Sequence, residues 1–160
     1  MIDFSLYLIT DRNQTAGRPL FDVVEAALEG GVRAVQLREK DLPTAELYDL
    51  AWEMRALTSR YDARLLINER IDVALAVEAD GVQLGINSLP VTAARRIAPD
   101  LLIGYSSHGV GEAAAAIAKG ADFVTFGPIF HTPSKAAYGE PVGVGELGRV
   151  CRQAVGDLVF

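Results

Sequence analysis

Residues 65–85 read LLINERIDVALAVEADGVQLG, and the pattern of this stretch indicates the fold class. The apolar run at 65–68 predicts a β-strand, residues 72–79 predict a short helix, and GVQL at 81–84 predicts a second strand. A strand, a helix and a strand in such quick succession are typical of a βαβ unit, whose two strands run parallel.

The same alternation extends in both directions along the chain. Further strands are predicted at 4–10, 33–38, 101–106 and 122–127, and the beginning of another at 158–160. Helices are predicted at 20–28, 44–58, 88–97, 110–118 and 145–153. About six strand–helix pairs predict an α/β fold with a parallel sheet, either a doubly wound open sheet or a (β/α)8 barrel. No G-x-G-x-x-G follows the first strand, which weakens the dinucleotide-binding version.

Composition excludes several classes of protein. The 160 residues carry 15 Lys and Arg against 21 Asp and Glu, a net charge of −6, and half of them are hydrophobic. This composition predicts a single globular domain over residues 1–160 that does not bind nucleic acid. Cys151 is the only cysteine, so an intrachain disulfide and a cysteine zinc site are excluded. We see no signal peptide or membrane span, so we expect a cytoplasmic protein with no membrane partner, and a homo-oligomer stays open.

The candidate functional residues follow the predicted strands, because both architectures form their sites at the carboxyl ends of parallel strands. Gln36, Arg38 and Lys40 recur with a period of two and so point to one face. Long polar side chains on a buried face need partners, which a ligand would supply. The alternative is that Lys40 is a solvated loop residue and that Arg38 pairs with Glu39 or Glu69.

Two later stretches add weaker signals. Thr132, Ser134 and Lys135 lie in the long loop after the sixth strand, where two hydroxyls and a lysine suit a phosphate group. His108 follows the fifth strand and is a candidate general acid or base, although a lone histidine is more often structural.

Four motifs together resemble the family of thiamine-phosphate synthases and thiazole tautomerases. They are VQLREKD (35–41), residues 65–85, IGYSSH (103–108) and GADFVTFGPIFHTPSK (120–135). The resemblance implies a (β/α)8 barrel that acts on thiazole phosphate in thiamin biosynthesis. It also implies that Gln36, Arg38, Lys40, Asn68, Ser106, Thr132, Ser134 and Lys135 bind substrate or phosphate.

The departures from the family pattern concern the metal site. The synthase couples hydroxymethylpyrimidine pyrophosphate to thiazole phosphate and uses two aspartates for Mg²⁺. Glu69 stands at the first of these positions, Ser88 at the second, and Gln83 replaces a nearby histidine. At most one carboxylate therefore remains, and Glu69 is the metal ligand only if the protein is synthase-like.

These departures predict a metal-independent thiazole tautomerase, an isomerase without a cofactor, in which His108 carries the proton. The alternative is a thiamine-phosphate synthase, a transferase with an altered Mg²⁺ site. A second alternative is a non-catalytic protein that binds a phosphorylated ligand. In each case the partner is a phosphorylated thiazole, joined in the synthase by the pyrimidine pyrophosphate. Because a barrel needs about 200 residues or more, we also expect the barrel to be truncated after about six and a half βα units.

Overall fold

The computed structural model describes residues 2–131, 140–153 and 157–159, and it is an α/β structure with parallel strands, as predicted. The chain divides into two compact units. The first unit contains residues 3–83 together with 98–102, and the second contains Ile2, residues 84–97 and the described residues from 103 onward. The prediction of a single domain over residues 1–160 stays a prediction.

Strands and helices alternate strictly in the first unit. Their bounds are β1 (Tyr7–Ile9), the 3-10 turn η1 (Arg12–Gln14), α1 (Leu20–Glu29), β2 (Ala34–Leu37), α2 (Thr44–Arg60), β3 (Arg64–Asn68), α3 (Ile71–Ala76) and β4 (Gly81–Leu84). The strands pair in chain order, with Ile9 beside Gln36, Gln36 beside Leu66, and Asn68 beside Gln83. Since all are parallel, their carboxyl ends share one edge of the sheet.

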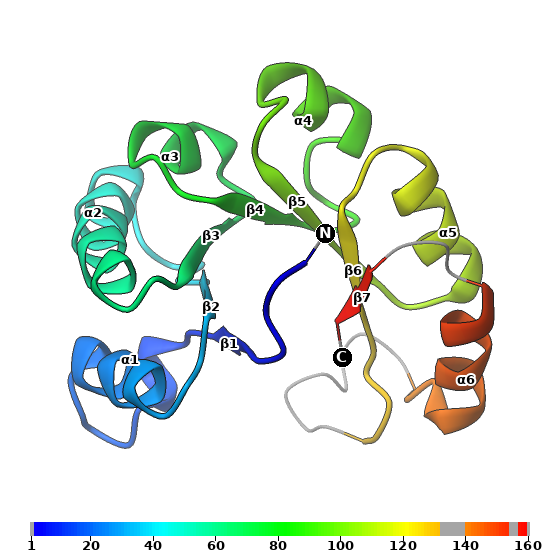
Figure 1. The fold of residues 1–160 in the computed structure, drawn as a ribbon, viewed down its shortest axis with the longest axis horizontal. Helices are drawn as coiled ribbons and strands as arrows, with labels where there is room; N and C mark the ends of the chain where they lie inside the picture. Colours follow the sequence, from blue (N-terminus) through cyan, green and yellow to red (C-terminus); the bar gives the residue numbers. More distant parts are fainter. Residues whose placement is uncertain (1, 132–139, 154–156, 160) are drawn as a thin grey trace. The chain divides into compact units, whose positions relative to one another are not determined.

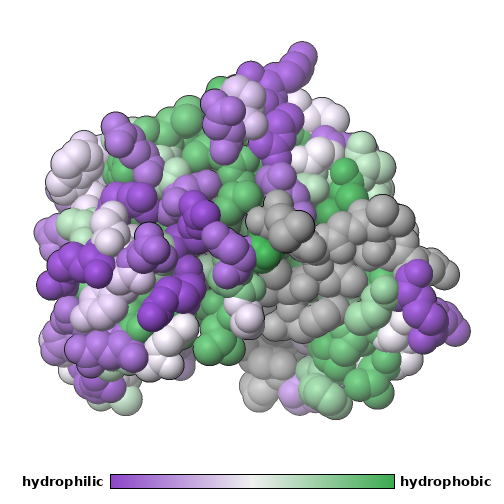
Figure 2. Space-filling view, in the orientation of Figure 1, coloured by the Kyte–Doolittle hydropathy of each residue, from purple (hydrophilic) through white to green (hydrophobic). Residues whose placement is uncertain are grey.

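The core of the first unit lies between these strands and their helices, which cover the outer side of the strands in Figure 1. Val35 and Leu37 of β2 are fully buried there, as the alternating pattern predicts. They pack in one cluster with Leu28 of α1 and Met54 of α2. The helices present polar residues outward, and Figure 2 shows a largely hydrophilic surface over α1 and α2.

The second unit repeats the pattern. Its elements are α4 (Val91–Ile97), β5 (Leu102–Ser107), α5 (Val110–Ala118), β6 (Phe123–Phe126), α6 (Gly143–Gln153) and β7 (Asp157–Val159). Strands β5, β6 and β7 are parallel neighbours, with Ser106 beside Thr125. The predicted elements are found here with shifted ends, for example α4 begins at Val91 rather than at residue 88. Within the described part of the chain, no helix has the length and apolarity that a membrane crossing requires.

Candidate active site

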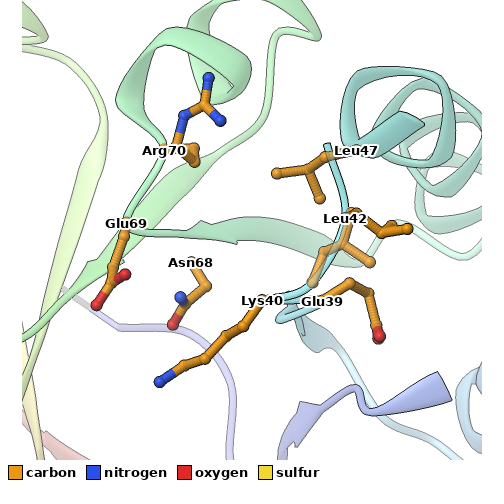
Figure 3. A pocket seen from close by; sticks show the side chains of 8 residues that line it. Glu39, Lys40, Leu42, Leu47, Asn68, Glu69 and Arg70 are labelled. Atoms are coloured by element: carbon orange, nitrogen blue, oxygen red, sulfur yellow. The ribbon is translucent and has the colours of Figure 1, made fainter. Parts of the chain in front are cut away.

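A cleft of about 260 Å³ opens at the carboxyl ends of β2 and β3 in the first unit (Figure 3). Its lining consists of Leu37, Glu39, Lys40, Leu42, Leu47, Asn68, Glu69 and Arg70. All of these residues lie at the ends of the two strands, in the turns that follow them, or on α2. The parallel register therefore brings together Lys40, Asn68 and Glu69, three residues that the sequence singled out.

The polar side chains of the cleft carry one available positive charge and one available negative charge. Lys40 and Glu69 are both exposed, and neither side chain forms a hydrogen bond or ion pair with any residue that the structure describes. In Figure 3, Asn68 lies between them, and the Lys40 and Glu69 side chains extend in the same direction. Such an arrangement suits a ligand that brings both an anion and a cation.

The Glu69 backbone has an unusual conformation. Its φ is +62°, in the left-handed region that non-glycine residues rarely adopt. The Glu69 N–H donates to the Gln83 carbonyl at 2.9 Å, and the next N–H, of Arg70, donates back to the Asn68 carbonyl at 2.8 Å. This tight turn ends β3 and places the Glu69 carboxylate at the cleft. A left-handed non-glycine residue at such a position is a frequent mark of a functional site.

The second basic residue of the lining, Arg70, is already engaged. Its Nε donates to Asp72 Oδ1 at 2.8 Å and its Nη1 donates to the Thr44 hydroxyl at 3.0 Å. The guanidinium holds the pKa of the Asp72 carboxyl below its ordinary value. Arg70 therefore joins the turn after β3 to the start of α2, and its charge is compensated by Asp72.

Glu39 also lines the cleft, but its side chain is only 1% exposed. Its carboxylate accepts hydrogen bonds from the Thr10 hydroxyl at 2.6 Å and from the Arg12 backbone N–H at 3.1 and 3.2 Å. Arg12 Nη1 adds an ion pair at 3.2 Å. The partner of Glu39 is thus Arg12, and the suggested pairing of Arg38 with Glu39 or Glu69 is wrong.

The other two predicted residues of strand β2 do not line this cleft. Gln36 is 2% exposed and contacts the hydroxyl of Tyr7, which itself donates to Gln83 Oε1 at 3.2 Å. Burial raises the pKa of Tyr7. Arg38 is half-buried, and its backbone N–H donates to the Thr10 hydroxyl at 3.0 Å.

In the second unit, the structure places Ser106 and His108 at the end of β5. The Ser106 hydroxyl lies 3.4 Å from the Thr125 hydroxyl on β6. The exposed His108 ring has its Nδ1 2.5 Å from the Gly127 carbonyl oxygen, and the His108 backbone N–H donates to Glu112 at 2.8 Å. Thr132, Ser134 and Lys135 lie outside the described residues.

Ser88, which the resemblance places where the family has its second aspartate, forms a hydrogen bond within its own turn. Its hydroxyl accepts a hydrogen bond from the Gly85 N–H at 2.8 Å and so closes the turn after β4.

Sequence reasoning missed Arg12 and Asp41, whose ion pair lies beside the cleft. The available signal was their place directly after two neighbouring parallel strands.

Comparison with known proteins identifies similar sequences. A family model described as thiamine monophosphate synthase matches residues 6–156. A "putative thiamine-phosphate synthase" of Geobacter sulfurreducens is 61% identical over 153 residues, which are 95% of this chain and 72% of the relative. A "thiamine-phosphate synthase" of Clostridium novyi is 45% identical over 150 residues, 93% of this chain and 74% of the relative.

Two solved structures are similar to the protein. A "thiamine phosphate pyrophosphorylase" of Pyrococcus furiosus superimposes with a TM-score of 0.89 at 40% identity, covering 97% of this chain and 73% of that one. A 3-dehydroquinate dehydratase of Geobacillus kaustophilus superimposes with a TM-score of 0.68 at 12% identity, a likeness of fold alone.

Proposed function

We infer the function from the family of the chain, which belongs to the thiamine monophosphate synthases. We propose that it is a thiamine-phosphate synthase, a transferase of thiamine biosynthesis. It joins hydroxymethylpyrimidine pyrophosphate to thiazole phosphate and releases pyrophosphate. The observation that carries this proposal is the cleft after β2 and β3, where the ammonium of Lys40 and the carboxylate of Glu69 are both available.

The tautomerase interpretation gives way to this alternative. The two relatives at 61% and 45% identity are named thiamine-phosphate synthases, and the solved structure at 40% identity is named a thiamine phosphate pyrophosphorylase. A tautomerase needs a proton carrier and no metal ligand, whereas the cleft presents a carboxylate without a protein partner among the described residues. His108 is then a residue that joins the turn after β5 to the Gly127 carbonyl.

Magnesium fits the cleft when a substrate supplies part of its ligand shell. Mg²⁺ takes oxygen ligands, usually one or two carboxylates with waters and substrate phosphate oxygens. Glu69 would hold it, with the Asn68 amide oxygen nearby, because the Glu39 carboxylate and the Ser88 hydroxyl have hydrogen-bond donors of their own. No group of three His, Cys, Asp or Glu side chains that could hold a metal occurs among the described residues, and pyrophosphate oxygens would supply further ligands. When bound, the metal neutralises charge on the leaving pyrophosphate.

The protein's own groups bind and orient the substrates in this proposal. The bond from the pyrimidine methylene carbon to the pyrophosphate oxygen breaks, and its electron pair leaves with the pyrophosphate. The thiazole ring nitrogen donates its lone pair to the methylene carbon and so forms the new C–N bond. Lys40 stabilises the negative charge of the pyrophosphate through a charge-assisted hydrogen bond. The family resemblance assigns substrate or phosphate binding also to Gln36, Arg38, Asn68, Ser106, Thr132, Ser134 and Lys135. Of the described residues in this set, Asn68 lines the cleft.

We propose further that the βα units are part of a (β/α)8 barrel and that the chain contains about six and a half of its units. The support is the parallel order of the described strands and the match to 73% of the solved pyrophosphorylase. An experimental structure that shows an open, doubly wound sheet would contradict this part.

Two activity assays of the purified protein, each with and without EDTA, test the function. We expect joining of the two substrates that EDTA abolishes, and no conversion of a thiazole carboxylate phosphate to its aromatic tautomer. Tautomer conversion that survives EDTA would restore the tautomerase interpretation. Binding of thiazole phosphate with neither turnover would favour the non-catalytic alternative.

Variants of the cleft test its assignment. We expect Lys40→Ala to weaken pyrophosphate binding by roughly tenfold or more, as the loss of one charge-assisted contact predicts. The exposed Lys119, which follows α5, offers a matched control in Lys119→Ala. Glu69→Gln should abolish the stimulation of pyrophosphate binding by Mg²⁺, and unchanged stimulation would remove Glu69 from the metal site.

A further inference from the structure

The turn that carries Lys40 is held on both sides by one residue, Arg12. The turn is Glu39–Leu42, in which the Leu42 N–H approaches the Glu39 carbonyl at 3.4 Å. Arg12 Nη1 lies 3.2 Å from Glu39 and 2.6 Å from Asp41 Oδ1, and its Nη2 lies 2.8 Å from Asp41 Oδ2. The residues directly before and after Lys40 are therefore bound to the same guanidinium.

The inner side of this clamp is buried and fully hydrogen-bonded. Glu39 is almost fully buried, and its two oxygens receive the Thr10 hydroxyl and the Arg12 backbone N–H in addition to the guanidinium. Thr10 in turn accepts the Arg38 N–H. The turn after β2 is thereby tied to the segment after β1 at several points, and Glu39 has no capacity left to bind a ligand itself.

The outer side of the clamp is the Asp41 carboxylate, which is exposed and paired with Arg12 in a bidentate geometry. Arginine presents donors in a planar fork, so one side chain can hold two carboxylates at once, which the point charge of a lysine cannot reproduce. Arg12 is 32% exposed and lies on η1, outside the cleft lining. Its guanidinium is directed to the two carboxylates on either side of Lys40.

We propose that Arg12 is a positioning residue that acts through Glu39 and Asp41: it fixes the turn Glu39–Leu42 and so holds Lys40 toward the pyrophosphate of the substrate. This inference rests on the proposed function, because it assigns the Lys40 ammonium to an anionic substrate. The Lys40 side chain has no partner among the described residues that would hold it in place. Its orientation then depends on its backbone, and the clamp determines that backbone.

The test uses binding of inorganic pyrophosphate with Mg²⁺, measured by calorimetry at a temperature where every variant is folded. We expect Arg12→Lys to weaken this binding by roughly tenfold, the size of effect that a misplaced charged contact produces. In the joining reaction, the KM for the pyrimidine pyrophosphate should rise by a larger factor than kcat falls. Arg60→Lys is the matched control, since Arg60 pairs with Glu25 on the helical side and is exposed.

A double-mutant cycle separates positioning from a general structural role. If Arg12 acts through Lys40, Arg12→Lys should change pyrophosphate binding by less than about twofold when Lys40 is already alanine. An equal weakening in both backgrounds would overturn the inference and leave the proposed function intact. A Lys40→Ala protein that binds pyrophosphate as the parent does would instead overturn the assignment of Lys40, and this result needs no change at Arg12.

Asp41→Asn provides a second variant in case Arg12→Lys does not fold. It removes one arm of the clamp at an exposed carboxylate and leaves the buried bonds of Glu39 in place. We expect weaker pyrophosphate binding in the same direction, again lost in the Lys40→Ala background. Unaltered binding by Asp41→Asn would contradict the part of the clamp that runs through Asp41.

Discussion

Replacing Glu39 by glutamine should destabilise the protein far more than an isosteric change usually does. The carboxylate accepts hydrogen bonds from Thr10, from the Arg12 backbone and from the Arg12 guanidinium. A glutamine offers one oxygen and one NH2 group. In either orientation of the amide, its NH2 group, a donor, replaces a carboxylate oxygen that had accepted hydrogen bonds from Thr10 or Arg12.

The size of the effect follows from these bonds. Losing one charge-assisted hydrogen bond costs about 1.5–3 kcal/mol, and a buried donor left without an acceptor adds about 1 kcal/mol or more. Arg12 is 32% exposed, so water can solvate part of the guanidinium and the lower values apply. We therefore expect Glu39→Gln to lower the free energy of unfolding by about 2–3 kcal/mol, a large part of the roughly 5–15 kcal/mol of a typical domain.

Urea unfolding followed by circular dichroism measures this loss. Glu53→Gln is the control, because Glu53 lies exposed in the middle of α2. We expect that control to change the free energy of unfolding by no more than about 0.5 kcal/mol. If Glu39→Gln is as mild as Glu53→Gln, the hydrogen bonds described for Glu39 do not hold the two segments together.

Three further predictions follow from local geometry. In Gly81→Ala, the new Cβ would lie 2.5 Å from the Leu102 carbonyl oxygen, so thermal unfolding should show a loss of about 1–3 kcal/mol, and an unchanged Tm would contradict this. Gly111→Ala, in open space on α5, should instead stabilise by about 0.5–1 kcal/mol in urea unfolding, and destabilisation would count against that environment. Hydrogen bonding to Arg12 lowers the pKa of Asp41 below its ordinary value of 3.8 in the folded protein, so the Asp41 carboxylate contributes to stability above pH 3.8 and this contribution is lost as the pH falls through the lowered pKa. Below pH 4 the urea midpoint of Asp41→Asn should therefore fall less than that of the parent protein, and parallel pH curves for the two proteins would refute this.

The order of the elements and the sheet edge that carries the cleft could be predicted from local sequence patterns. Helical and strand periods depend on neighbours a few residues apart, so the βαβ pattern at 65–85 was readable without any tertiary information. The period of two in strand β2 likewise assigned Val35 and Leu37 to the helical side, where they are buried. Parallel strands end at one edge, and this rule alone placed Lys40 and Asn68 near each other.

The pairing of the polar groups depends on the folded chain and could not be predicted from the sequence. Glu39 pairs with Arg12, 27 residues away, and not with its neighbour Arg38, because the register of β1 and β2 brings the segments after them together. The same register buries Gln36 against Tyr7 and leaves the Lys40 ammonium without a partner among the described residues. A side chain's residue type states what it is able to bind, but hydrogen bonds reach only about 3 Å, and only the folded chain sets which groups come that close.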